Sequence, residues 1–478
     1  MEIISLTGAW QLQQEGDATV IPAQVPGCVH TDLLQTGLID DPFYRRQELD
    51  VQWVGERNWV YTREFTVPAE MLTRQRVLLH CDGLDTFAQV LLNDTLLGVC
   101  DNMFRTWEFD VTPVLRDGVN RLTVQFDSPL PYMAQQQAIH PLATTQNAPH
   151  EHAGRSYVRK MPCGFGWDWG PALVTCGIWR SLELRAFDVA RLRDVSIQQD
   201  HSQAGVVELS VVVVVEDLVP PSTCTAAVTL SLQGSMVAET CCPIGADGAS
   251  AQLTITNPQL WWPRGMGEQP LYQVQVRLLD ADGIERDQWV RRIGLRSLRL
   301  DRHPDEWGES FQFVANGIPF FAKGGNWIPA DAFVTRVTPD TYRALLQSCA
   351  DANMNMLRVW GGGIYEDDFF YDLCDELGIC VWQEFIFACA SYPAWDPAFL
   401  ANVRGEAEDN VRRLRHHASL ALWCGNNELE MCGYVREDAD SQDRMGWTDY
   451  RTLFDTLLPD VVTRLDPEHD YWPSSSHT

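Results

Sequence analysis

The first 185 residues alternate apolar and polar positions over short segments. Residues 57–67, 76–98 and 120–128 show this alternation, and Gly, Asn and Asp punctuate the segments. A period of two places successive side chains on opposite faces of a β-strand. Asn93-Asp94 separates two apolar runs and predicts a hairpin turn. The pattern over residues 1–185 is therefore typical of an antiparallel β-sandwich.

The same pattern continues through residues 186–296. Residues 206–218, 225–234 and 270–283 have the composition of strands. The apolar run Val211–Val215 predicts a strand buried on both faces, and residues 220–222 predict a loop. These segments predict a second sandwich of about 100 residues.

After residue 297 strand-like and helix-like segments alternate. The predicted strands are 320–327, 354–363, 379–385, 419–428 and 471–476, and the predicted helices are 338–353, 366–378, 397–417 and 447–467. Thr338 and Pro339 mark the start of one helix and Gly378 the end of the next. This alternation favours parallel strands linked by helices.

Residues 297–478 contain five predicted strands, whereas a closed (β/α)₈ barrel typically needs about 250 residues. Two interpretations follow, an open α/β sheet or a barrel that lacks its second half. We favour an incomplete TIM barrel, because the chain stops at a loop-like Ser474-Ser475-Ser476-His477-Thr478.

Charge and cysteine usage exclude several classes of function. The formal net charge is −29, which disfavours nucleic acid and anionic membranes as partners. No run of about 18 apolar residues predicts a membrane span, and the N-terminus lacks a signal-peptide pattern. The 14 cysteines form no regular framework, so we expect a reduced, cytoplasmic protein. The 18 tryptophans suit both cores and sugar-binding clefts.

Polar side chains follow the predicted strands at the ends where barrels carry their catalytic groups. Arg358 with Trp360, Glu384, and Asn427 with Glu428 occupy these positions. Glu428 is a candidate proton donor, and the alternative is an ordinary surface or helix-capping carboxylate. Glu384 is interpreted as an ion-pair partner of Arg358, with a catalytic role as the alternative.

No set of His, Cys, Asp and Glu residues has the spacing of a metal site, so no metal is predicted. His30, His416 and His417 are not expected to be ligands, and His416-His417 falls at the end of a predicted helix, where a cation suits the helix dipole. No cofactor is expected.

Several ordered segments resemble glycoside hydrolase family 2, in its β-mannosidase branch. Residues 419–430 (SLALWCGNNELE) resemble the family's acid/base motif. The further matches are 25–45, 53–65, 164–180 (GFGWDWGPALVTCGIWR), 257–272, 321–331 (FAKGGNWIPAD), 357–366 (LRVWGGGIYE) and 381–393 (VWQEFIFACASYP). They run in order from about residue 8 to the end of the chain.

The resemblance implies a jelly-roll-like β-sandwich over 1–185, an immunoglobulin-like β-sandwich over 186–296 and a catalytic barrel over 297–478. It implies a retaining exo-β-mannosidase that hydrolyses terminal non-reducing β-D-mannose by double displacement. Glu428 maps onto the general acid/base, and Asn427 is expected to contact the sugar 2-hydroxyl. In the family, the nucleophilic Glu lies on a later barrel strand, well beyond the position of Glu428. Glu430, Glu437 and Glu468 do not match it, so the nucleophile is not expected in this chain.

The resemblance also assigns binding roles. Asp168, in Trp167-Asp168-Trp169, is expected to bind sugar hydroxyls, and Trp167 beside it is expected to contact a ring face of the sugar. The alternative is a packed tryptophan corner in which Asp168 caps a turn. Trp360 is a candidate platform for the sugar, or else a core residue. Two other functions stay open, a different sugar specificity within family 2 and a non-catalytic carbohydrate-binding fragment. The sequence does not specify the oligomeric state.

Overall fold

In a computed structural model, which describes residues 1–145, 152–218, 223–245, 248–438 and 442–477, the first alternating region forms two facing sheets. Their strand orders are β3-β2-β4-β9-β6-β7 and β1-β12-β5-β8. Asn93 and Asp94 adopt φ values of 52° and 65° between β6 and β7, which confirms the predicted hairpin. The strands are β1 (Glu2–Ser5), β2 (Gly8–Gln14), β3 (Val20–Val25), β4 (Trp59–Thr66), β5 (Arg76–Cys81), β6 (Phe87–Leu92), β7 (Thr95–Cys100), β8 (Trp107–Asp110), β9 (Val119–Asp127) and β12 (Leu182–Phe187).

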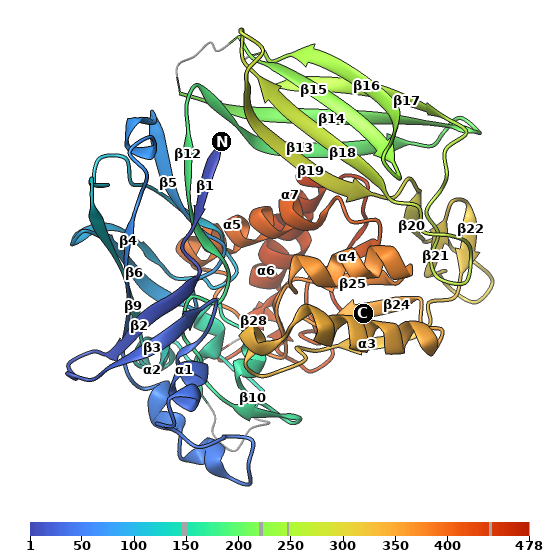
Figure 1. Cartoon of the computed structure of the whole chain (residues 1–478). Coiled ribbons are helices and arrows are strands. Elements are labelled where there is room, and N and C mark those ends of the chain that lie inside the picture. Colours follow the sequence, from blue (N-terminus) through green and yellow to red (C-terminus); the bar gives the residue numbers. More distant parts are fainter. Residues whose placement is uncertain (146–151, 219–222, 246–247, 439–441, 478) are drawn as a thin grey trace.

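Three insertions decorate this sandwich. Helix α1 (Val29–Gln35) follows β3, and helix α2 (Pro129–Ile139) follows β9. A short hairpin of β10 (Phe165–Trp167) and β11 (Gly170–Ala172) extends beneath the α/β region (Figure 1).

The second region is a sandwich of three-stranded and four-stranded sheets, ordered β13-β14-β17 and β16-β15-β18-β19. The strands are β13 (Ala190–Asp200), β14 (Val206–Asp217), β15 (Thr225–Leu232), β16 (Ser235–Pro243), β17 (Ala249–Thr256), β18 (Tyr272–Leu279) and β19 (Glu285–Ile293). The expectation that Val211–Val215 is buried on both faces is wrong. Val211 and Val213 are buried but Val214 is 39% exposed, because only one face of β14 packs against the other sheet. Residues 220–222 lie outside the described residues.

The third region contains a parallel sheet, ordered β23-β24-β25-β26-β29, with β23 and β29 at its edges. The five predicted strands and the helices between them are therefore present. The elements are β23 (Gly324–Trp327), α3 (Pro339–Asp351), β24 (Met356–Val359), α4 (Asp368–Leu377), β25 (Cys380–Glu384), α5 (Pro397–Leu414), β26 (Leu420–Cys424), β27 (Val435–Arg436), β28 (Met445–Gly446), α6 (Trp447–Tyr450), α7 (Leu458–Leu465) and β29 (Tyr471–Trp472).

Local signals set the ends of two helices. The Thr338 hydroxyl accepts a hydrogen bond from the Thr341 amide at the start of α3. Gly378 ends α4 in the left-handed conformation, with φ of 72°. The prediction of one regular helix over 447–467 is wrong, because residues 451–457 form a π-helix between α6 and α7. Pro459 has no amide hydrogen for the carbonyl four residues earlier, which disfavours a regular α-helical turn there.

A small antiparallel sheet covers the amino-terminal ends of the parallel strands. It consists of β20 (Leu298–Asp301), β21 (Gln312–Ala315) and β22 (Ile318–Phe320). Its Leu300 and Phe313 pack in one cluster with Met356 and Cys380, the first residues of β24 and β25. The sequence analysis did not predict this sheet.

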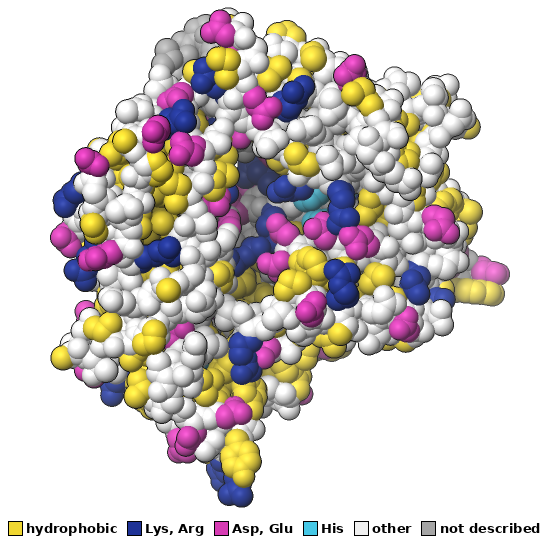
Figure 2. All heavy atoms as spheres, in the orientation of Figure 1, with side chains coloured by type: hydrophobic (Ala, Val, Ile, Leu, Met, Phe, Trp, Pro, Cys, Tyr) yellow, Lys and Arg dark blue, Asp and Glu magenta, His cyan; other side chains and the backbone are white. Residues whose placement is uncertain are grey.

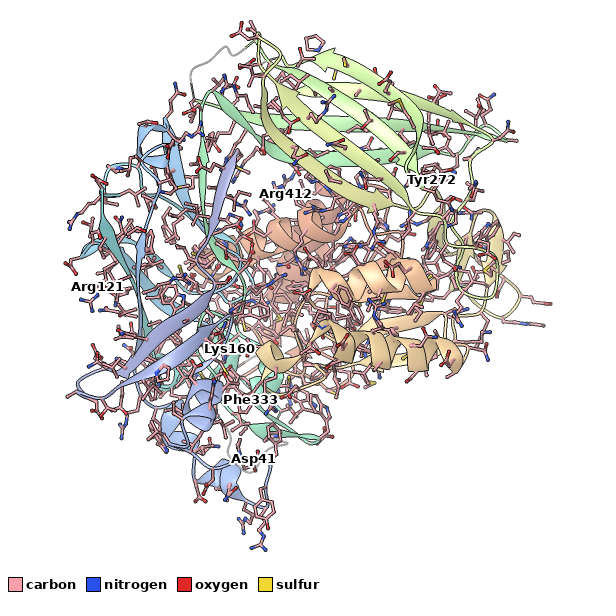
Figure 3. The ribbon with its side chains drawn as sticks, viewed as in Figure 1. Asp41, Arg121, Lys160, Tyr272, Phe333 and Arg412 are labelled. Carbon is pink, nitrogen blue, oxygen red and sulfur yellow. The ribbon has the colours of Figure 1, made fainter. Side chains whose placement is uncertain are left out.

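Both sandwiches pack against the α/β region around a central hollow (Figures 1 and 2). Lys160 lies where the first sandwich meets the α/β region and is paired with Asp85 (Figure 3). On α5, Arg412 faces the second sandwich and lies 3.6 Å from Asp194. Across the described residues, no helix has the length and apolar character needed to cross a membrane.

Glu366 makes the stability of the α/β region depend on pH. The side chain accepts hydrogen bonds from Trp327 and Tyr342, and burial raises its pKa to about 7. The folded state therefore holds a proton that the unfolded state releases at lower pH, so stability is lost as pH rises towards 7. Glu366→Gln removes this loss because an amide does not titrate; its oxygen can accept from Trp327, and its NH₂ group can donate to the Tyr342 hydroxyl oxygen.

We expect the wild type to lose about 3 kcal/mol of unfolding free energy between pH 4.5 and 7.5 relative to Glu366→Gln. Urea denaturation of both proteins across this range measures the difference. Parallel pH profiles for the two proteins would contradict the prediction.

Candidate active site

Arg358 connects the carboxyl ends of three parallel strands. Arg358 lies in β24. Its guanidinium donates hydrogen bonds to Asn326 at 2.8 Å, to Glu384 at 2.9 Å and to the amide oxygen of Asn427 at 2.5 Å. Parallel strands bring their carboxyl ends to one edge of the sheet, which explains why residues from β23, β24, β25 and the segment after β26 meet.

Glu384, the last residue of β25, is completely buried. One oxygen pairs with Arg358 at 2.8 Å, and the other accepts the Gly361 amide at 2.7 Å. Burial raises the pKa of Glu384, although the charge of Arg358 and the hydrogen bonds oppose this effect. The interpretation of Glu384 as an ion-pair partner of Arg358 is confirmed.

Glu428 lies four residues beyond the end of β26, so the predicted strand over 419–428 is too long. Its backbone is left-handed, with φ of 63°, a conformation that a strand cannot continue. The Glu428 amide donates to the carbonyl of Ser475 at 2.9 Å, and its side chain is partly exposed. Non-glycine residues held in this conformation cost about 1–3 kcal/mol and cluster at functional sites.

The Glu428 carboxylate contacts two cysteines. One oxygen lies 3.3 Å from Cys389 Sγ and 3.7 Å from Cys432 Sγ. Asn427 is buried, and its amide nitrogen lies 3.3 Å from the same Cys389 sulfur. Asn427 also pairs in short bridges with Ala388 and Ser475, which fixes the backbone beside Glu428.

Trp167-Asp168-Trp169 forms the tip of the β10–β11 hairpin. Trp167 and Trp169 lie edge-on to Trp360, with ring centroids 4.8 and 5.6 Å apart. Asp168 is exposed at the turn. The first sandwich therefore brings a carboxylate and an indole pair to the residue that follows β24.

The exposed ring of this cluster belongs to Trp169. Trp169 is 46% exposed, whereas Trp167 and Trp360 are 8% and 6% exposed. The expectation that Trp167 and Trp360 present sugar-binding surfaces therefore does not fit their burial, because covered rings have little area to offer. The core role that stood as the alternative for Trp360 fits better. The second tryptophan of the Trp167-Asp168-Trp169 motif was the sequence signal that could have identified Trp169 as the exposed ring.

Arg155 links the hairpin to the Glu428 segment. Its guanidinium lies 5.2 Å from the centre of the Trp167 ring and donates to the Cys389 carbonyl at 3.0 Å. Cys389 in turn contacts Glu428. The sequence analysis missed Arg155 and Cys389. For Cys389, its place within 381–393, a segment that resembles the family, was a usable signal, whereas Arg155 had none.

Two cavities adjoin these residues. A cavity of about 350 Å³ lies beside Trp169 and is lined by Ile328, Asp331 and Arg336. A groove of about 610 Å³ runs along the sheet from Phe321 past Arg358. In closed barrels side chains fill the corresponding interior. Within the described residues, the group of side chains with metal-like spacing lies elsewhere, at Asp372, Asp375 and His417.

Comparisons with known proteins agree with this architecture. Residues 10–180 match the family model "Glycosyl hydrolase 2 galactose-binding domain-like", and residues 190–296 match "Glycosyl hydrolases family 2". The chain is similar to a β-mannosidase of Bos taurus, with 39% identity over 96% of this chain and 52% of the relative. It is 37% identical to β-mannosidase B of Emericella nidulans, over 98% of this chain and 57% of the relative.

Solved structures give the same result. The β-D-mannosidase of Dictyoglomus thermophilum superposes with a TM-score of 0.92 at 42% identity, over 99% of this chain and 58% of that chain. An exo-chitosanase of Amycolatopsis orientalis, at 18% identity and a TM-score of 0.75, shares the fold. The chain spans about half the length of the curated relatives it matches. This chain belongs to glycoside hydrolase family 2.

Proposed function

We propose that this chain carries the acid/base half of the active site of a retaining exo-β-mannosidase, which removes terminal non-reducing β-D-mannose. The observation that carries the proposal is Glu428, held in a left-handed conformation beyond β26 beside Asn427. In this proposal its partly exposed carboxylate protonates the glycosidic oxygen and later deprotonates water. The identities of 37–42% to β-mannosidases support mannose over other sugars.

A retaining reaction needs a second carboxylate about 5–5.5 Å from the first. Glu384 is a poor candidate, because it is fully buried and its two oxygens are taken by Arg358 and Gly361. Glu430 accepts hydrogen bonds from Tyr450 and pairs with His477. We infer that the nucleophile comes from polypeptide outside these 478 residues. The β23 and β29 edges of the sheet are where such strands would pair.

The test measures hydrolysis of aryl β-mannoside, β-glucoside and β-galactoside. The 478-residue chain is compared with the same chain extended by whatever the gene encodes after Thr478. The proposal expects turnover of the mannoside by the extended protein and none by the chain alone. Preferred hydrolysis of another glycoside would assign a different specificity within the family. Turnover by the 478-residue chain itself would refute an external nucleophile.

A non-catalytic carbohydrate-binding role is the second candidate, because the exposed Asp168 and Trp169 offer a sugar contact without a second carboxylate. Mannose binding by the chain, together with no turnover by any extended form, would favour it.

Asp168→Asn should weaken mannose binding about 10–100-fold. A charged acceptor contributes about 1.5–3 kcal/mol to a hydrogen bond with a hydroxyl, and tenfold corresponds to 1.4 kcal/mol. Titration calorimetry with mannose, or quenching of the nearby tryptophans, measures the change. Asp282→Asn is a matched control, because Asp282 is an exposed turn residue in the second sandwich. Equal mannose affinity in Asp168→Asn and Asp282→Asn would show that Asp168 does not contact the sugar.

A further inference from the structure

A small pocket lies where the second sandwich meets α4 and the end of α5. Its volume is about 210 Å³, and its walls include Arg291, Arg292, Asp372, His416 and His417. In Figure 2 the central hollow shows a histidine surrounded by basic and acidic side chains. The pocket is separate from Glu428, and nothing in the proposed function uses it.

His417 presents an unpartnered nitrogen there. The side chain is only 2% exposed, and its Nδ1 lies 2.7 Å from an oxygen of Asp375. The other Asp375 oxygen accepts the Ser419 amide at 2.7 Å. Within the described residues, the buried Nε2 of His417 has no hydrogen-bond partner. A carboxylate that holds Nδ1–H leaves the Nε2 lone pair directed away from it, as in the second shell of histidine metal ligands.

Asp372 supplies a carboxylate to the same pocket. One ligand atom each from Asp372, Asp375 and His417 lie within 4.8 Å of one another. Asp372 is 42% exposed, and one of its oxygens contacts Arg292 at 3.2 Å. Arg292 is also paired with Glu376 at 2.7 Å, so its charge is shared between two carboxylates.

We propose that this pocket binds a divalent first-row transition-metal ion such as Zn²⁺ through His417 Nε2 and the Asp372 carboxylate. Asp375 orients the imidazole, and water completes the coordination. Imidazole and carboxylate ligands suit Zn²⁺ and its neighbours. The proposal departs from the sequence-based expectation of no metal site, because α4 and the turn after α5 are brought together only by folding.

A cation explains the pocket better than an anion does. An anion could meet Arg291 and Arg292, but it would also face the carboxylates of Asp368 and Asp372. Arg292 is already paired with Asp372 and Glu376. A water molecule in place of a metal is the simplest competing explanation for the unpartnered nitrogen, and it predicts no metal affinity.

The test uses the intact chain after chelator treatment. Calorimetric titration with Zn²⁺ is expected to show a site that Asp372→Asn weakens on the order of 10–100-fold. Asp372 is partly exposed, so this variant should fold, and its melting curve without metal checks that. Asp301→Asn is the control, because Asp301 lies 3.2 Å from the exposed His303 in a similar pair.

The free thiols require a separate check, because Cys241 and Cys432 are exposed and thiolates bind Zn²⁺. Titration with Co²⁺ distinguishes the sites, since nitrogen and oxygen ligands give no sulfur-to-metal charge-transfer band. In the wild type we expect a Co²⁺ absorption spectrum without the sulfur-to-metal charge-transfer band. In Asp372→Asn we expect this Co²⁺ spectrum to be lost. No binding, thiolate-type spectra alone, or equal affinity in wild type and Asp372→Asn would each overturn the proposal.

Discussion

Glu428→Gln is expected to slow hydrolysis of a β-mannoside with a poor leaving group by about 10²–10⁴-fold, in the form of the protein that turns over mannosides. A glutamine cannot deliver a proton to the departing oxygen. An activated aryl mannoside needs little protonation, so its glycosylation step should slow far less. Steady-state kcat/KM values across a series of leaving groups measure this difference, because kcat/KM reports the steps up to leaving-group departure.

Glu437→Gln provides the control for this substitution. Glu437 is exposed, nine residues beyond Glu428 in the same polypeptide segment. It should leave the whole series unchanged. Equal slowing of activated and poor leaving groups by Glu428→Gln would remove the acid role, although not a role in substrate binding.

Glu406→Gln should lower the free energy of unfolding by about 3–5 kcal/mol. Glu406 on α5 is 1% exposed and accepts a two-point contact from Arg159, at 2.6 and 2.8 Å. Asn102 and Tyr365 donate to the same carboxylate at 2.9 and 3.1 Å. A glutamine would turn an NH₂ group towards one of these donors and leave the buried guanidinium without its counter-charge.

Glu408→Gln tests whether burial causes this effect. Glu408 lies on the same helix and pairs with Arg412 and Arg464, but its side chain is 23% exposed. A pair of this kind contributes about 0–1 kcal/mol. Guanidinium denaturation followed by tryptophan fluorescence compares both variants with the wild type. Similar midpoints for the two variants would contradict the role of the buried contact between the first sandwich and α5.

Periodicity predicted the elements wherever one face of each element is buried and the other is not. The period of two in residues 57–67 corresponds to β4, and Thr338 and Gly378 set helix ends through their own backbone hydrogen bonds and conformation. These signals act over a few residues, so the sequence alone carries them.

Periodicity failed where distant groups decide. The run Val211–Val215 reads as buried on both faces, yet burial of Val214 depends on whether another layer covers β14. The early end of β26 likewise depends on its neighbours. In the last case Gly425 packs against the segment after β29.

The sequence by itself determined the order of the two sandwiches and the α/β region, the family resemblance, and the place of Asn427 and Glu428 at the end of a predicted strand. Only the tertiary structure decided which groups meet Glu428, since Arg155 and Cys389 are far from it in the chain. It also exposed Trp169 while it buried Trp167 and Trp360, and it placed Asp372 beside His417. The physical reason is that periodicity, turns and helix caps are encoded locally, whereas burial, charge pairing and ligand geometry depend on contacts between distant segments.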